Sequence, residues 1–293
     1  SIEIWVVTCC LLTWLILYWG SYQSLEKILL AMVLLFSFIT ILIAFSMQTT
    51  EYEVSIRQIS RGLTFNFPTE FLPLALAVFG FTGISYGEIM AYTYWCLEKG
   101  YAQDTNNDIN ETKAWIKTMQ TDVWVTVFFI TIGTLPFFFL GAGVLHYVPE
   151  LQESLANNSF WDVDVIGALQ NMFSLVLGGW AKWLFVVLAF FVLFSTLLSG
   201  TAAFTRTIAD YLISTGLIFE QKETRVYLIK LIAFFIPFFS GIFYFILPNP
   251  ITLLIIAGIW AAMGLPIVNI GALYLISKLD SDLQPKQTTK NIL

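Results

Sequence analysis

Long apolar runs separated by shorter polar stretches dominate the pattern of this chain. A helix needs about 20 mostly apolar residues to cross a bilayer, and on that rule the chain contains seven candidate spans. Their approximate ranges are 2–19, 25–47, 71–96, 123–145, 181–203, 226–247 and 251–276. The pattern therefore predicts an all-α polytopic membrane protein that forms one transmembrane domain over residues 1–293.

The third run, FLPLALAVFGFTGISYGEIMAYTYWC, is interrupted near its middle. Gly80, Gly83 and Gly87 weaken a helix there, and Glu88 places a carboxylate at membrane depth. Backbone that leaves the helix inside a membrane is tolerated only where it is buried in protein or lines a cavity. Many secondary transporters bind ions where two half-helices meet at an unwound centre. We predict a discontinuous third helix, broken near residues 83–88, that carries half of a substrate site.

The composition supports the membrane class and narrows the function. The chain is 58% hydrophobic and 12% charged, whereas soluble domains carry about twice that charged fraction. These fractions indicate that a lipid bilayer surrounds the protein. There is no basic patch that would bind nucleic acid. No nucleophile motif, phosphate loop or His-rich cluster is present, and we predict neither an enzyme nor a bound cofactor.

The distribution of Lys and Arg predicts the orientation of the chain, because basic residues collect on the cytoplasmic side. Eleven of the 14 lie in the loops and helix ends that follow the odd-numbered spans or in the C-terminal tail. The other side holds only Arg57, Arg61 and Lys182. We predict a cytoplasmic C-terminus, an external loop at 146–180, and residence in the plasma (inner) membrane.

Each polar residue at the break has a functional and a structural interpretation. Glu88 is either a cation ligand or proton carrier, or the partner of a structural hydrogen bond, and Tyr92 lies on the same helix face. Unwinding would expose carbonyl oxygens near Gly83, and hard cations prefer oxygen ligands. Gly83 and Gly87 could equally serve close helix packing. Ser85 and Tyr86 could be ligands or could bond a neighbouring helix.

Two further polar residues lie in other spans. Asn269 follows Gly264 and Pro266 in the seventh span, where it either faces the cavity or bonds a neighbouring helix. We expect Pro266 to kink that helix. Asp122 opens the predicted fourth span, and a carboxylate at a helix start is commonly a cap.

Several stretches together resemble the Nramp family of divalent metal transporters, most closely its divergent, magnesium-transporter-like branch. SYQSLEKILLAMVLLFSF is similar to the family's loop 4–5 and the start of helix 5. TDVWVTVFFITIGTLPFFFLGAGVLH is similar to helix 7, ETRVYLIKLIAFFIPFF to helix 9, and GLPIVNIGALYLISK to helix 10. The run YWCLEKGYA is typical of the divergent branch.

This resemblance implies an inverted-repeat fold like that of amino-acid transporters, with the seven spans as helices 4 to 10. The chain is then a fragment that lacks helices 1 to 3, and helix 1 supplies a metal-binding Asp and Asn in the family. The family's helix 6 carries Met-Pro-His, whereas this chain has GISYGE. Loss of the soft Met sulfur and gain of Glu88 favour a harder cation. Loss of the His argues against proton coupling by the family's route, although Glu88 could replace it.

The main hypothesis is therefore a transporter of a divalent metal cation, with magnesium or manganese favoured. The expected ligand-bearing residues are Gly83, Ser85, Tyr86, Gly87, Glu88 and Asn269. Two alternatives stay open: a symporter of amino acids or other organic solutes on the same fold, and a truncated remnant that does not transport.

Overall fold

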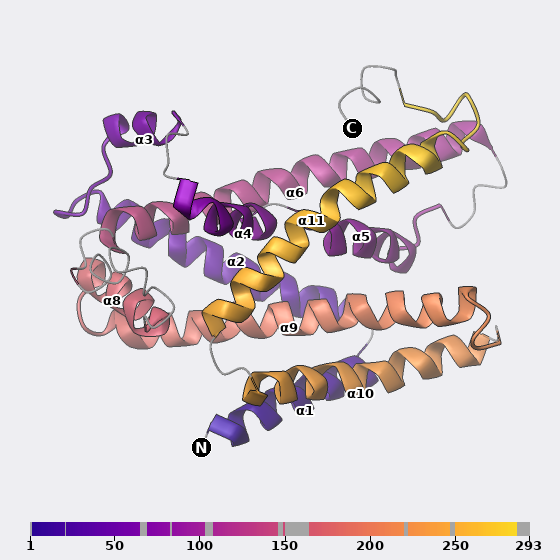
Figure 1. Cartoon of the computed structure of the whole chain (residues 1–293), viewed down its shortest axis with the longest axis horizontal. Coiled ribbons are helices and arrows are strands. Elements are labelled where there is room, and N and C mark those ends of the chain that lie inside the picture. Colours follow the sequence, from indigo (N-terminus) through magenta and orange to yellow (C-terminus); the bar gives the residue numbers. More distant parts are fainter. Residues whose placement is uncertain are drawn as a thin grey trace. The chain divides into compact units, whose positions relative to one another are not determined.

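The computed structural model describes residues 2–20, 22–64, 69–82, 84–102, 108–145, 149, 164–219, 222–246 and 250–285. These residues form helices joined by turns and contain no strand (Figure 1). By its internal contacts the chain divides into two compact units, made of residues 1–67 with 131–252 and of residues 68–130 with 253–293. Gly83 and His146 are outside the described residues.

The first unit contains most of the long helices. They are α1 (Ile2–Trp19), α2 (Tyr22–Met47), α3 (Ile56–Gly62), α8 (Val165–Leu177), α9 (Ala181–Ser214) and α10 (Lys222–Ile246), with residues 131–144 of α6 (Ile109–Val144). Apart from α3 and α8, these are long apolar segments that a bilayer can surround.

Helices α1 and α10 run antiparallel, as three contacts along their length show. At the middle of α1, the Cys10 thiol donates to the carbonyl oxygen of Pro237 at 3.2 Å. One turn further, the rings of Trp14 and Phe234 meet edge to face with centroids 5.3 Å apart. At the end of α1, Lys230 Nζ lies 4.7 Å from the centre of the Tyr18 ring. The aromatic and cation–π contacts add to the burial of apolar surface between the two helices.

Helix α8 closes a hydrophobic core at one end of the first unit. Asp164 caps it by accepting the N–H of Gly167 at 3.0 Å, and Gly178 ends it with φ 90°. Phe173 is fully buried, and its ring centroid lies 5.1 Å from that of Phe185 on α9. The core also contains Met172 of α8 and residues of α2, α6 and α9: Ile43, Met47, Leu140, Val144, Ala181 and Leu188. Helix α8 therefore buries one face in the protein.

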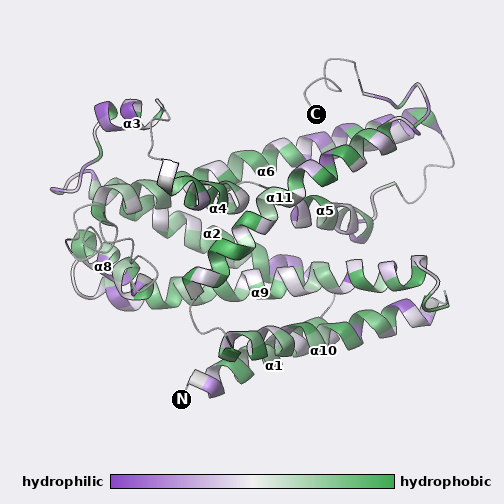
Figure 2. Ribbon diagram, in the orientation of Figure 1, coloured by the Kyte–Doolittle hydropathy of each residue, from purple (hydrophilic) through white to green (hydrophobic). Residues whose placement is uncertain are grey.

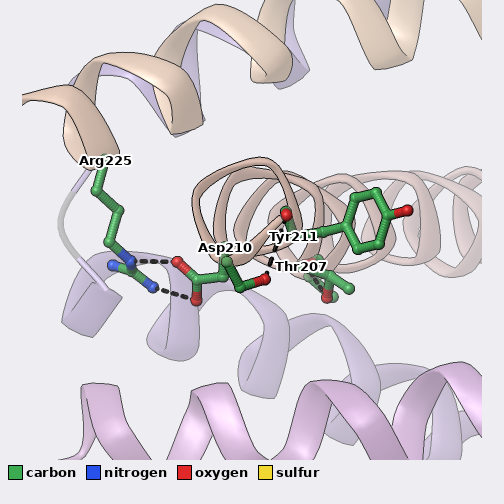
Figure 3. Close-up of polar contacts among 6 residues, drawn as sticks. Thr207, Asp210, Tyr211 and Arg225 are labelled. Carbon is green, nitrogen blue, oxygen red and sulfur yellow. Dashed lines mark hydrogen bonds and ion pairs between the residues drawn. The ribbon is translucent and has the colours of Figure 1, made fainter. Parts of the chain in front are cut away.

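An ion pair joins the end of α9 to the start of α10 (Figure 3). Arg225 Nε and Nη2 lie 2.6 and 3.1 Å from the two carboxylate oxygens of Asp210. This fork-to-fork geometry fixes the direction of the turn between the helices more strongly than a single contact would. Both side chains are about one third exposed, so we expect a modest contribution to stability.

The second unit contains the interrupted helix. It consists of η1 (Thr69–Phe71), α4 (Leu72–Thr82), α5 (Tyr86–Glu98), residues 109–130 of α6, and nearly all of α11 (Pro250–Ile276). Tyr101 lies in the turn after α5, where Gly100 has φ 81° and Ala102 has φ 58°. That turn brings Tyr101 back against α6.

Six stretches among the described residues are long and apolar enough to cross a membrane. They are Gln23–Met47, Leu72–Glu98, Ile109–Val144, Ala181–Ser214, Glu223–Ile246 and Ile251–Ile276. The expected first span corresponds to α1, which is shorter than these six. Apolar residues predominate along the long helices, and hydrophilic ones are frequent in α3 (Figure 2). Many large apolar side chains are exposed on these helices, as expected where lipid is the solvent.

The start of α6 differs from the sequence-based expectation. Helix α6 begins at Ile109, where we expected a polar connection up to residue 121. The stretch INETKAWIKTMQ contains good helix formers such as Glu, Lys, Ala and Gln, so its polarity does not prevent a helix. Asp122 consequently lies inside α6, and the expectation that it caps a helix start was wrong. Helix α11 continues through Pro266 to Ile276.

Candidate functional site

The interrupted helix contains the break that the glycine spacing predicts. Helix α4 ends at Thr82 and α5 begins at Tyr86, with Ile84 and Ser85 between them in a non-helical conformation. Ser85 is the N-cap of α5 and is extended, with φ −73° and ψ 165°. Gly83, the first residue of the gap and a predicted site residue, is outside the described residues.

Glu88 lies in the first turn of α5, directly beside this break. Its Oε2 accepts a hydrogen bond from the backbone N–H of Ser85. The first amides of a helix have no partner within the helix, and a carboxylate three residues after the N-cap commonly reaches back to the N-cap N–H. The Glu88 side chain is otherwise exposed in the chain as described. Glu88 thus has a structural partner, and it presents a carboxylate at the break.

Tyr86, the first residue of α5, is held by α11. Its hydroxyl oxygen accepts a hydrogen bond from Trp260 Nε1 at 3.2 Å. Its ring lies against Gly264, where an added Cβ would lie 2.7 Å from the ring carbon Cγ. Tyr86 therefore bonds a neighbouring helix, which is the structural interpretation of this residue.

Gly87 and Gly80 play different parts although both flank the break. A Cβ at Gly87 would meet only Ser85 Oγ, at an ordinary 3.8 Å, so packing does not require glycine there. Gly80 is buried in α4 against α11, and a Cβ would lie 2.9 Å from the carbonyl carbon of Gly258 and 3.0 Å from the backbone nitrogen of Ala262. Small residues that let helix backbones approach closely are common in membrane proteins. The packing interpretation thus applies to Gly80.

The structure brings Ser85, Tyr86, Gly87 and Glu88 together, but it does not place Asn269 with them. Asn269 is half-buried on α11, five residues after Gly264. At 100° per residue, its side chain leaves α11 about 140° away from the face that meets Tyr86. Among the described residues, no group of three or more His, Cys, Asp or Glu side chains is arranged to hold a metal ion. Among the described residues at the break, the Glu88 carboxylate is a hard oxygen donor of the kind that such cations prefer.

The comparison with known protein families decides the class of this protein. Residues 1–282 match the Nramp family, described as natural resistance-associated macrophage protein-like. The chain belongs to the Nramp family. No curated relative and no solved structure matches this sequence.

As a member of the Nramp family, this chain is an integral membrane protein. The general function of the family is the transport of divalent metal cations. Nramp proteins are transporters rather than enzymes, and they carry the metal as their substrate without a cofactor. The long apolar helices of both units agree with this assignment.

A second polar cluster in this Nramp chain lies away from the break. The Tyr101 hydroxyl donates to Asp122 Oδ2 at 2.7 Å, and the Tyr92 hydroxyl donates to the carbonyl oxygen of Met119 at 3.2 Å. Tyr92 therefore holds α5 against α6, and its hydroxyl hydrogen-bonds Met119 rather than Glu88. The partner of Glu88 could have been read from the sequence, because Ser85-Tyr86-Gly87-Glu88 has the Ser-x-x-Glu spacing of a capping box.

Proposed function

We propose that this Nramp protein transports a hard divalent cation, with magnesium or manganese favoured, and that the break between α4 and α5 holds the ion. Glu88 is the residue on which this proposal mainly rests, because it presents a carboxylate where the helix backbone is open. Magnesium binds through one or two carboxylates and keeps much of its water, and manganese also suits oxygen ligands. Gly83, Ser85, Tyr86 and Gly87 would complete this half of the site.

The chemistry of the segment supports a harder ion than a softer one. It contains no sulfur ligand and no His between Thr82 and Glu88. Soft thioether ligands favour softer metals, so their absence removes that selectivity. The missing His also leads us to propose transport that is not coupled to protons. We further propose the seven-helix, inverted-repeat arrangement that the family resemblance implies, in the plasma membrane. The C-terminus is cytoplasmic in this proposal, and the uneven distribution of Lys and Arg supports that orientation.

The α5 N-terminus argues against an organic anion as substrate. A half-helix N-terminus can bind a substrate carboxylate through its free amides. Here the Glu88 carboxylate already accepts the N–H of Ser85 and would repel a second carboxylate. An amino-acid symporter is therefore the weaker alternative.

The decisive experiment compares Glu88→Gln with Glu88→Ala in the full-length protein reconstituted into liposomes. Gln keeps a side-chain oxygen that can cap α5 but loses the charge, whereas Ala loses both. We expect both variants to lose at least about tenfold in magnesium and manganese flux, because loss of even an outer-shell partner of a metal site typically costs about 10- to 100-fold in affinity or activity. Glu111→Gln removes an exposed acidic residue from the first turn of α6 and serves as the matched control.

Two outcomes would contradict the proposal. Full flux in Glu88→Gln, with only Glu88→Ala impaired, would show that Glu88 is a helix cap and nothing more. Competition of flux by amino acids rather than by metals would favour the organic-solute alternative. Proton coupling is tested separately by following the internal pH during magnesium entry, which we expect to stay constant.

A further inference from the structure

Helix α11 contacts both halves of the interrupted helix, one on each side of the break. Gly258 and Ala262 lie against Gly80 of α4. Trp260 and Gly264 lie against Tyr86 of α5. Residues four apart share a face of a helix, so each pair forms a short stripe along α11.

The contact with α4 is made by close backbone approach together with the Phe81 ring. An added Cβ at Gly258 would lie 2.7 Å from the carbonyl oxygen of Ala77 and 2.8 Å from the Phe81 ring, and Gly80 faces Gly258 directly. Backbones that approach this closely have almost no freedom to slide, because no flexible side chain separates them. The end of α4 is therefore held at a fixed distance from α11.

The contact with α5 combines shape with a directed hydrogen bond. The Tyr86 ring covers Gly264, and the Tyr86 hydroxyl takes the one hydrogen that Trp260 Nε1 can donate. Tyr86 is the first residue of α5 and lies two residues before Glu88. A rotation or shift of this turn would move the Glu88 carboxylate with it.

We propose that α11 sets the width and orientation of the break, and that Trp260 and Gly264 are positioning residues for the end of α5 that carries Glu88. The inference rests on the proposed function in one respect, because the group that α11 positions is the proposed metal ligand. Because the helical hydrogen bonding is interrupted between α4 and α5, it does not by itself fix the separation of the two half-helices. Helix α11 supplies that constraint from the other end of the sequence.

The first test is independent of transport. Amide hydrogen exchange of Ile89, Met90 and Ala91 reports how often the first turn of α5 opens. We expect Trp260→Phe and Tyr86→Phe each to raise this exchange about two- to tenfold, as the loss of one hydrogen bond implies. The double variant should exchange no faster than either single one, because both remove the same contact.

Two matched controls are present in the chain. Trp183→Phe changes a tryptophan that is 78% exposed on α9. Gly271→Ala adds a methyl to α11 where no atom lies within 4 Å, whereas Gly264→Ala adds one against the Tyr86 ring. We expect both controls to leave the exchange of α5 unchanged and Gly264→Ala to raise it by about tenfold or more, since overpacking exceeds the loss of one hydrogen bond.

The second test measures magnesium flux in the full-length protein. A misplaced ligand weakens ion binding more than it slows the conformational cycle, so Trp260→Phe should raise the KM for magnesium more than it lowers the maximal rate. Equal exchange in Trp260→Phe and Trp183→Phe, or additive effects of Trp260→Phe and Tyr86→Phe, would overturn the role of α11. Raised exchange together with full flux in Glu88→Gln would instead keep the role of α11 and reject the metal site.

Discussion

Gly80 of α4 and Gly258 of α11 meet backbone to backbone, and neither position has space for a side chain. We expect Gly80→Ala to lower the free energy of unfolding by about 1–3 kcal/mol, because the added methyl forces the two backbones apart. Thermal unfolding in detergent, compared with Gly271→Ala on the same α11, measures this effect. A Gly80→Ala variant as stable as Gly271→Ala would show that the close approach of the two helices is not required.

Gly87 allows a test of function that is separate from stability. Its position is open, so Gly87→Ala should leave the fold intact and stabilise the helix by up to about 1 kcal/mol. If the backbone beside Glu88 approaches the ion, the new methyl should nevertheless reduce metal flux. A lower flux at an unchanged or raised melting temperature assigns Gly87 to the ion path. Unchanged flux removes it from the proposed site.

The hydrogen bond between Tyr101 and Asp122 should contribute to stability at the junction of α5 and α6. Tyr101→Phe removes the donor and leaves the half-buried carboxylate with one partner fewer. We expect a loss of about 1 kcal/mol in the free energy of unfolding. Tyr227→Phe on α10, whose side chain is 64% exposed, is the control. Equal melting temperatures for the two variants would mean that this hydrogen bond does not stabilise the folded chain.

The core around α8 should be the most sensitive part of the first unit. Phe173 is fully buried, and truncation of a buried Phe leaves a cavity as well as losing apolar contact. We expect Phe173→Ala to cost about 3–5 kcal/mol, whereas Phe219→Ala, at a side chain that is 88% exposed, should cost little. Chemical unfolding of both variants checks the difference. Similar midpoints would show that α8 is not part of the stable core.

Local sequence features were sufficient to predict most of the helices and the position of the break. Apolar runs predict the long helices, and the glycines before Glu88 predict that the helix is interrupted there. The extension of α6 back to Ile109 could not be predicted from polarity, because polar residues are common both in loops and on exposed helices. The helix propensity of these residues was the better guide. The cap formed by Ser85 and Glu88 also depends only on local sequence, because the two residues are three positions apart.

The contacts between distant segments could not be predicted in this way. Trp260 and Tyr86 are 174 positions apart, and nothing in either local pattern indicates that one bonds the other. The bond from Tyr101 to Asp122 depends on a turn in which Gly100 and Ala102 both have positive φ. Which face of α11 meets α5, and therefore where Asn269 points, follows only from the packed structure.

The hydrogen bond between Ser85 and Glu88 matters for the state of the transporter in which no metal ion is bound. An ionised carboxylate within a membrane costs free energy when no cation is bound to it. Helix N-termini stabilise negative charge through their free amides, and the Ser85 amide already lies against this carboxylate. In the proposed transport cycle, the unloaded protein thus keeps a partner for its anionic group. The amide that the interruption leaves free would thus also stabilise the Glu88 carboxylate after the ion has left.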